Sequence, residues 1–113
     1  MRNQELEYRV LKLLEQRPDL TQRQLAQELG VSLGKTNYLV KSLIDVGWVK
    51  LENFQKSDSK WAYAYLLTPK GIVEKAAITV QFLVRKKHEY NELQEEIEQL
   101  QEEVRQQQDL NKK

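Results

Sequence analysis

Residues 20–50, "LTQRQLAQELGVSLGKTNYLVKSLIDVGWVK", decide the fold of this chain. Thr21 is placed to cap a short helix, because Gln24 follows three residues later as in a capping box. Gly30 suits the left-handed end of that helix. After a very short turn, a second helix is expected over residues 32–46. Two helices joined by a tight turn that contains glycine are the pattern of a helix-turn-helix.

The second of these helices lies in an acid-free stretch. Residues 29–44 contain no carboxylate, although Glu28 stands directly before them and Asp45 directly after. In a helix-turn-helix, the N-terminal part of the second helix enters the major groove between the phosphates of both strands. A carboxylate there would be repelled, whereas the positive end of the helix dipole, beginning at the N-cap Ser32, favours phosphate oxygens. The pattern therefore predicts that helix 32–46 reads DNA.

The elements around this motif complete a winged helix. A first amphipathic helix is expected to end near Arg17. Residues 48–54, "WVKLENF", and 61–67, "WAYAYLL", alternate like strands and flank the polar run "QKSDSK" at 55–60, which predicts an antiparallel hairpin with a long loop. Thr68 then caps a return helix that starts with proline. The expected fold class is mainly α with a small β-hairpin, a winged helix-turn-helix.

The return helix has no glycine or proline after Gly71, and we expect it to continue to about Leu110. From about residue 89 its apolar side chains follow a heptad seam that favours a homodimer. The predicted seam residues are Tyr90, Leu93, Ile97, Leu100 and Val104. The alternative is a solvated acidic helix folded back on the body. The expected domains are a winged helix-turn-helix over 1–70 and a long C-terminal helix over 71–113, with coiled-coil dimerisation in its second part.

Charge is divided unevenly along the chain. Residues 1–88 hold 15 Lys and Arg against 9 Asp and Glu, a net charge of +6. Residues 89–113 hold 3 against 8, a net charge of −5. A basic body with an acidic tail suggests a polyanion as the partner of the body.

The composition offers little for catalysis. The chain has no cysteine, which rules out disulfides and cysteine metal sites. Its single histidine, His88, lies in the run "RKKHEY" without an adjacent nucleophile, and no phosphate-binding glycine motif occurs. We therefore predict a protein that is not an enzyme and needs neither a metal nor a cofactor. Without a long apolar run or a signal peptide, we also predict a cytoplasmic protein that has no membrane partner.

Three segments resemble the MarR-type winged-helix transcriptional regulators. Residues 20–50 resemble the helix-turn-helix of that family and its run into the first wing strand, and "YLLTPKG" at 65–71 resembles the Leu-Thr-x-x-Gly that closes the wing. More narrowly, residues 28–54 and 63–72, followed by a Glu-rich tail, resemble the small MarR-family regulators associated with exopolysaccharide (EPS) gene clusters. The resemblance implies a regulator of transcription, possible control of exopolysaccharide genes, and double-stranded DNA as partner.

The chain departs from the larger MarR regulators in two respects. In that family, the larger regulators have a longer chain with extra terminal helices that build the dimer, and often an effector pocket. Here a single C-terminal helix would have to form the dimer. The sequence therefore gives no indication of a small-molecule effector. The wing also lacks the usual Asp-x-Arg-Arg tip and offers Lys56, Asp58 and Lys60 instead.

Side chains opposite the predicted buried face of helix 32–46 are candidates for DNA contact. Lys35 can donate to guanine, Asn37 can pair with adenine, and Leu33 can contact a thymine methyl group. The wing lysines can approach flanking DNA, although they could equally be ordinary solvated side chains. The predicted DNA-binding residues are Arg23, Ser32, Leu33, Gly34, Lys35, Asn37, Tyr38, Lys41, Lys56 and Lys60.

These observations predict a homodimeric, sequence-specific DNA-binding regulator of transcription. Helix 32–46 would occupy the major groove, and the wing at 55–60 would lie on flanking DNA. The alternative is a winged-helix module for protein–protein interaction, which recruits a partner through the acidic C-terminal helix.

Overall fold

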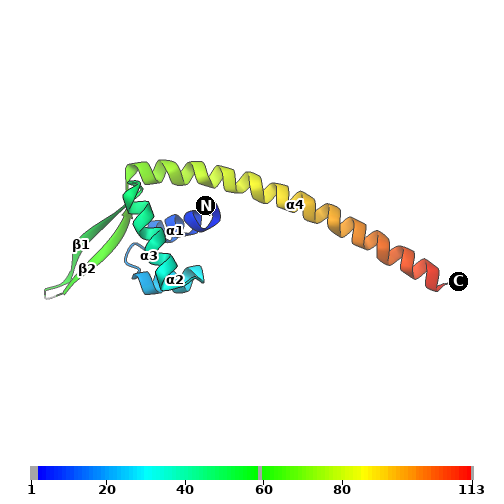
Figure 1. Ribbon diagram of the computed structural model, residues 1–113, viewed down its shortest axis with the longest axis horizontal. Coiled ribbons are helices and arrows are strands. Elements are labelled where there is room, and N and C mark those ends of the chain that lie inside the picture. The colour runs from blue at the N-terminus through cyan, green and yellow to red at the C-terminus, as the bar shows by residue number, and fades with distance from the viewer. Residues whose placement is uncertain (1–2, 59, 113) are drawn as a thin grey trace. The chain divides into compact units, whose positions relative to one another are not determined.

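The computed structural model describes residues 3–58 and 60–112, apart from the side chain of Trp61. These residues form four helices and one hairpin, which Figure 1 shows from the N-terminus in blue to the C-terminus in red. The elements are α1 (Gln4–Gln16), α2 (Gln22–Leu29), α3 (Leu33–Asp45), β1 (Val49–Ser57), β2 (Lys60–Leu67) and α4 (Pro69–Asn111). The chain divides into two compact units, residues 1–80 and 81–113. The predicted winged helix-turn-helix with a long C-terminal helix is confirmed.

Local capping interactions and glycines set the bounds of α2 and the end of α3. Gln24 N donates to the Thr21 hydroxyl (3.1 Å) while the Gln24 side chain accepts from Thr21 N (3.0 Å), so the predicted capping box is complete. Gly30 ends α2 in the left-handed conformation at φ 69°. At the end of α3, Gly47 takes φ 81°. The predicted cap at Thr21 and the predicted helix end at Gly30 are confirmed, and α3 ends within one residue of the predicted end at 46.

One hydrophobic core holds the first unit together. Leu11 and Leu14 of α1, Leu25 of α2 and Val40 of α3 are at most 1% exposed. Ile78 of α4 belongs to the same cluster. Burying one such side chain stabilises the fold by about 1.5–3 kcal/mol. The core therefore fixes the orientation of α3, which matters for any surface that α3 presents.

The hairpin is longer than its sequence predicts. β1 and β2 pair antiparallel from Val49 opposite Leu67 to Ser57 opposite Lys60, with an irregular register between Gln55 and Ser57. The prediction of a polar loop over 55–60 is therefore wrong for most of its length, and Ser59 lies outside the described residues. Strand pairing uses backbone hydrogen bonds, so a polar segment exposed on both faces can be a strand without showing the alternation that marks one.

Backbone contacts join the end of α3, both strands and the start of α4. Thr68 N donates to the carbonyl of Trp48 (3.0 Å), and the Thr68 hydroxyl donates to the carbonyl of Gly47. The same hydroxyl accepts from Gly71 N (3.0 Å), so it caps α4 as predicted. A Cβ on Gly71 would lie 1.9 Å from the carbonyl oxygen of Trp48. Only glycine fits at this position without movement of the backbone.

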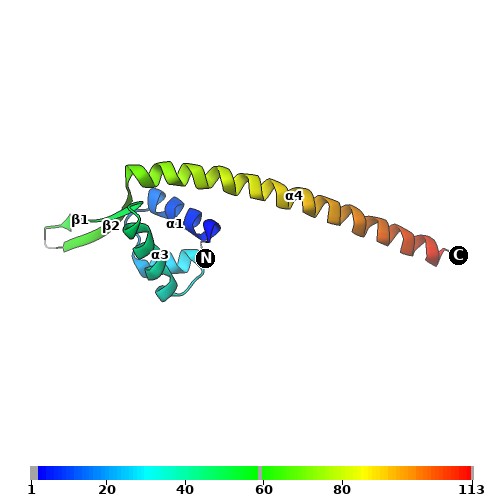
Figure 2. The same cartoon turned by 45° about the horizontal axis from the view of Figure 1, so that its top comes forward.

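The hairpin projects away from α1, α2 and α3 in both Figure 1 and Figure 2, which differ by a 45° turn. Its base is held by Tyr65, whose backbone N–H donates to the carbonyl of Pro18 (3.1 Å) and whose hydroxyl accepts from the Gln22 side chain (3.0 Å). The far end of the hairpin is exposed. The projecting hairpin of β1 and β2 is the wing of the winged helix.

The prediction that α4 continues to about Leu110 is confirmed, since the helix ends at Asn111. It begins at Pro69, the favoured position for proline in a helix. Across residues 3–58 and 60–112, no helix has both the length and the apolar character needed to cross a bilayer.

We predict that Gly71→Ala destabilises the fold by about 1–3 kcal/mol, because the added methyl group overlaps a backbone carbonyl. The matched control is Gly34→Ala. A Cβ at Gly34 meets nothing within 4 Å, so alanine in this helix should raise stability by about 0.5–1 kcal/mol. Urea unfolding of the two variants and the wild type measures both changes. Equal midpoints for Gly71→Ala and wild type would contradict the contact with Trp48.

Candidate nucleic-acid interface

Helix α3 has one face in the core and one in solvent. Thr36, Val40 and Leu43 are buried, and Leu39 and Ile44 are half-buried. Although Thr36 is fully buried, its hydroxyl donates to the carbonyl of Ser32 (2.9 Å), so the polar group is satisfied. The inward face thus anchors α3 without involving its outer side chains.

The outer face of α3 consists of the side chains that the sequence assigns to DNA contact. Tyr38 is 72% exposed and Leu33 is 44% exposed. The other predicted contact residues of this helix are also exposed, namely Gly34, Lys35, Asn37 and Lys41. We call these six residues the α3 outer face.

The N-terminus of α3 is preformed for an anion. The Ser32 hydroxyl accepts from Lys35 N (3.1 Å) and caps the helix as predicted. No acidic residue lies in the first turn. The positive end of the helix dipole therefore emerges next to the α3 outer face without a carboxylate to offset it.

The acid that precedes this region is held by two arginines of the first helix and its end. Arg17 Nη1 lies 3.0 Å from Glu28 Oε1, and Arg9 Nη2 donates to the carbonyl of Glu28 (3.2 Å). Sequence reasoning missed this contact. A single acid directly before the acid-free stretch, together with arginines in and just after the preceding helix, could have suggested it. The ion pair reduces the repulsion that Glu28 would exert on a nearby phosphate.

The other predicted DNA-binding residues lie on separate elements. Arg23 is exposed in the first turn of α2. Lys56 of β1 and Lys60 of β2 are exposed near the end of the hairpin. The structure therefore groups six of the predicted residues on the outer face of α3, with Ser32 at its start. It leaves Arg23 and the two wing lysines on neighbouring elements.

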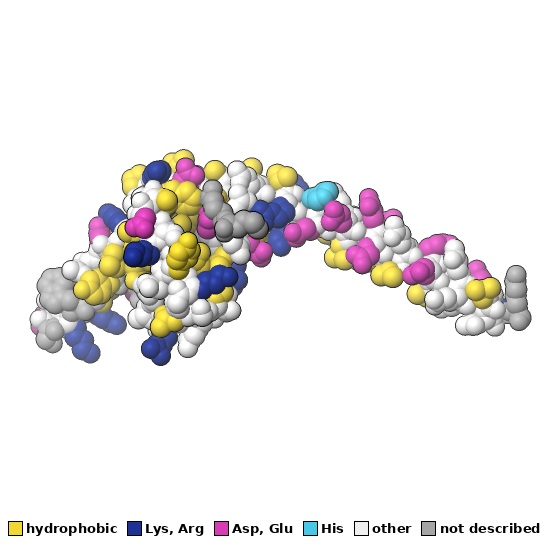
Figure 3. Space-filling model, viewed as in Figure 1, with side chains coloured by type: hydrophobic (Ala, Val, Ile, Leu, Met, Phe, Trp, Pro, Cys, Tyr) yellow, Lys and Arg dark blue, Asp and Glu magenta, His cyan; other side chains and the backbone are white. Residues whose placement is uncertain are grey.

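Charged side chains are distributed as the sequence indicates. On the face shown in Figure 3, Asp and Glu side chains follow the C-terminal part of α4, and Lys and Arg side chains occur over the N-terminal elements. Within the described part of the chain, no group of three or more His, Asp or Glu side chains could hold a metal ion.

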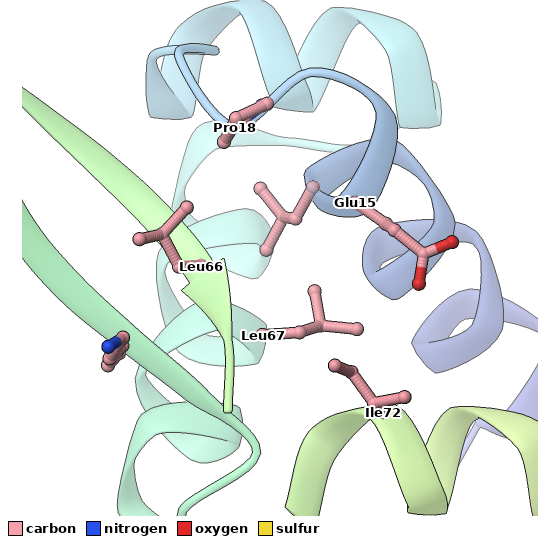
Figure 4. A pocket seen from close by; sticks show the side chains of 7 residues that line it. Glu15, Pro18, Leu66, Leu67 and Ile72 are labelled. Carbon is pink, nitrogen blue, oxygen red and sulfur yellow. The ribbon is translucent and has the colours of Figure 1, made fainter. Parts of the chain in front are cut away.

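A small apolar hollow of about 320 Å³ lies between α1, the hairpin and the start of α4. Figure 4 shows the labelled lining residues, which come from all three elements. The lining residues are Leu14, Glu15, Pro18, Lys50, Leu66, Leu67 and Ile72. Small-molecule sites have volumes of roughly 300–1,000 Å³, so this hollow is at the lower limit. Its two charged side chains are engaged, Glu15 with Lys75 (2.9 Å) and Lys50 with Glu52 (2.8 Å).

The five predicted seam residues lie on α4 in the second unit. They are between 44% and 59% exposed, which is high for large apolar side chains. Their exposure is compatible with a partner helix, and dimerisation remains a prediction.

The comparisons with known proteins agree with this geometry. Residues 4–50 match a protein family described as winged helix-turn-helix DNA-binding. The match covers less than half of the chain and ends at the start of the hairpin. A search of curated proteins gives no match.

Several solved structures share the fold. S. pneumoniae FabT, in a complex with DNA, has 20% identity and a TM-score of 0.55, over 73% of this chain and 56% of FabT. A mutant of S. aureus MepR has 21% identity and a TM-score of 0.63, over 92% of this chain and 75% of MepR. A MarR family regulator from Silicibacter pomeroyi has 27% identity and a TM-score of 0.56, over 73% of this chain and 52% of that protein.

The fold is that of the MarR-family regulators. The chain spans little more than half the length of FabT and of the S. pomeroyi regulator. The link to exopolysaccharide genes has no counterpart among these proteins.

We predict that Ser32→Ala destabilises the fold by about 1 kcal/mol, because it removes the cap of α3. Ser32→Asp retains an accepting oxygen at the cap, so its stability should stay within about 0.5 kcal/mol of wild type. Thermal or urea unfolding measures both variants. A stable Ser32→Ala protein would show that the start of α3 does not depend on this hydrogen bond.

Proposed function

We propose that this chain is a homodimeric, sequence-specific DNA-binding regulator of transcription. The observation that carries the proposal is the α3 outer face, which is exposed, free of carboxylates and adjacent to a preformed helix N-terminus. A helix of this kind following a tight turn is the element that helix-turn-helix proteins insert into the major groove.

The outer face of α3 offers the chemistry for reading bases. Lys35 would donate to the O6 and N7 atoms of guanine, and Asn37 would form a bidentate pair with adenine. Leu33 would contact a thymine methyl group. Gly34 has open space where a side chain would stand, so the backbone of α3 can approach the DNA closely at this position.

Phosphate contacts would fix the register of the helix on the duplex. Tyr38 and Lys41 lie further along the exposed face of α3. Ser32 lies at the start of α3, and Arg23 lies on α2. The wing at 55–60 would reach flanking DNA with Lys56 and Lys60. Such contacts weaken with salt, because each one releases counterions from the DNA.

The comparisons support this reading. The matched family is a DNA-binding family rather than an enzyme family, and the FabT structure contains DNA. A regulator acting on DNA would work in the cytoplasm, as the sequence suggests.

Pairing of α4 through its exposed seam would produce a dimer with two recognition helices. A two-fold dimer binds two half-sites about 34–36 Å apart, or one helical turn of DNA. We expect the operator to be a pseudo-palindrome for this reason.

The target genes we propose are exopolysaccharide genes, on the resemblance of residues 28–54 and 63–72 alone. Sequencing of genomic fragments that co-purify with the protein tests this assignment. Enrichment of promoters upstream of polysaccharide-synthesis genes is the expected result. Enrichment of unrelated promoters would reject the targets and leave DNA binding intact.

Two substitutions on α3 should separate affinity from specificity. Lys41→Ala should weaken binding to all duplexes alike and lower the salt slope by about 1, because it removes one phosphate contact. Asn37→Ala should relax the preference at particular bases at a cost of about 1–3 kcal/mol. Fluorescence anisotropy with an operator and with single-base variants, at several salt concentrations, measures both effects. Wild-type binding by both variants would place the reading surface elsewhere.

The competing function is a module that recruits a protein through the acidic part of α4. Ser32→Asp distinguishes the two functions, since it keeps the helix cap but adds a carboxylate beside the α3 outer face. Loss of duplex binding by a stable Ser32→Asp protein is the result expected of a DNA reader. Binding of no duplex by the wild type, even at low salt, favours the protein-recruiting module.

A further inference from the structure

The second unit presents an apolar seam with a regular pattern of flanking residues. Ile97 and Val104 occupy a positions of the heptad, and Leu93 and Leu100 occupy d positions. The g positions beside the seam are Glu89, Glu96 and Glu103, and the e positions are Gln94, Gln101 and Gln108. One flank of the seam is therefore anionic, and the other is neutral.

The seam contains both halves of a knobs-into-holes contact. Ile97, Leu100, Gln101 and Val104 line a shallow hollow on the helix surface. In paired helices, a side chain at a or d enters a hole formed by four residues of the facing helix. Leu100 is both a wall of this hollow and an exposed d residue that could fill one. A surface that carries the knob and the hole together fits a second copy of itself.

The flanking residues discriminate between the two ways of pairing. In a parallel pair in register, each g residue faces an e residue of the partner, so Glu96 meets the partner's Gln101. Glutamine can donate a hydrogen bond to the carboxylate and adds no charge. In an antiparallel pair the g flanks face each other, so glutamates would meet glutamates. Like charges in such positions are destabilising.

No shift of register gives these glutamates an oppositely charged partner in the antiparallel pair. Between residues 81 and 111 the remaining g positions are Phe82 and Leu110, which carry no charge. A glutamate on one helix therefore finds no cation at a g position of an antiparallel partner. Lys86, which precedes the seam, lies 3.1 Å from Glu89 within its own helix.

We propose that two copies of α4 pair in parallel and in register through Tyr90–Val104, with the Glu and Gln flanks excluding the antiparallel arrangement. The inference rests on the homodimer of the proposed function and specifies its geometry. Both chains then enter the pair at the same end. In an antiparallel pair of residues 90–104, the residues at which the paired segment begins in the two chains would lie roughly 20 Å apart, at about 1.5 Å per residue.

Because the chain has no cysteine, single cysteines report on the geometry directly. Gln107→Cys places a thiol at the d position after the seam, where parallel chains bring the two thiols together. Gln106→Cys is the matched control on the outer side of the helix. In a glutathione redox buffer, the first variant should form a disulfide-linked dimer at least tenfold more readily than the second. Equal cross-linking in a sample that sediments as a dimer overturns the parallel arrangement.

A charge substitution gives an independent readout with opposite signs. Gln101→Lys would set a cation opposite the partner's Glu96 in the parallel pair, so the dimer dissociation constant should fall by roughly threefold to tenfold. In an antiparallel pair the e flanks face each other, and the two lysines would raise this constant. Gln106→Lys adds the same charge away from the interface and controls for the change in net charge. A higher dissociation constant for Gln101→Lys overturns the proposal.

Sedimentation and gel shifts on the same samples separate this proposal from the proposed function. A disulfide-linked parallel dimer that binds no duplex supports the pairing geometry and rejects the DNA-binding role. A wild-type protein that stays monomeric at high concentration overturns the pairing, whatever its affinity for a single half-site.

Discussion

The carbonyl groups of Gly47 and Trp48 hold the winged helix together. Trp48 N donates to the carbonyl of Leu43 at the end of α3 (2.9 Å), and Thr68 at the end of β2 bonds to both residues. The first turn of α4 then packs on Trp48 so closely that only Gly71 fits. Helix α3, the wing and α4 therefore meet at one set of backbone contacts. These contacts position the wing beside α3 together with the packing of Val49 in the core.

With its frame fixed in this way, α3 divides its side chains between two tasks. Thr36 and Val40 are buried in the core, and the backbone N–H of Lys35 donates to the capping hydroxyl of Ser32. The side chains of Lys35 and Tyr38 are exposed and lie outside the core. Gly34 is the clearest case, because neither a turn nor a close neighbour demands glycine there. A residue that costs helix stability without serving the fold points to a constraint from outside the chain.

Sequence reasoning succeeded where the cause was local and failed where it was distant. The cap at Thr21 and the helix end at Gly30 depend on residues within about one helical turn, so their signals are readable. The length of the hairpin was missed because a polar, solvent-exposed strand shows no alternation. The contact of Arg17 with Glu28 joins two helices, and no pattern within either helix specifies it. The exposure of the α3 outer face was predicted, whereas the ion pair of Glu28 with Arg17 was not.

The short seam on α4 links the pairing of the chains to their proposed site of action. With few apolar heptads and no interhelical ion pairs, the proposed dimer would be weak, because each knob-into-hole layer adds only a limited apolar area. On an operator with two half-sites, the first bound chain raises the effective concentration of the second near its own half-site. DNA would then stabilise the dimer as much as the dimer stabilises binding, by the reciprocity of linked equilibria. Occupancy of the operator would therefore rise more steeply than in proportion to the concentration of the chain. A seam of this strength suits a regulator that responds to its own abundance, whereas a long coiled coil would remove that dependence.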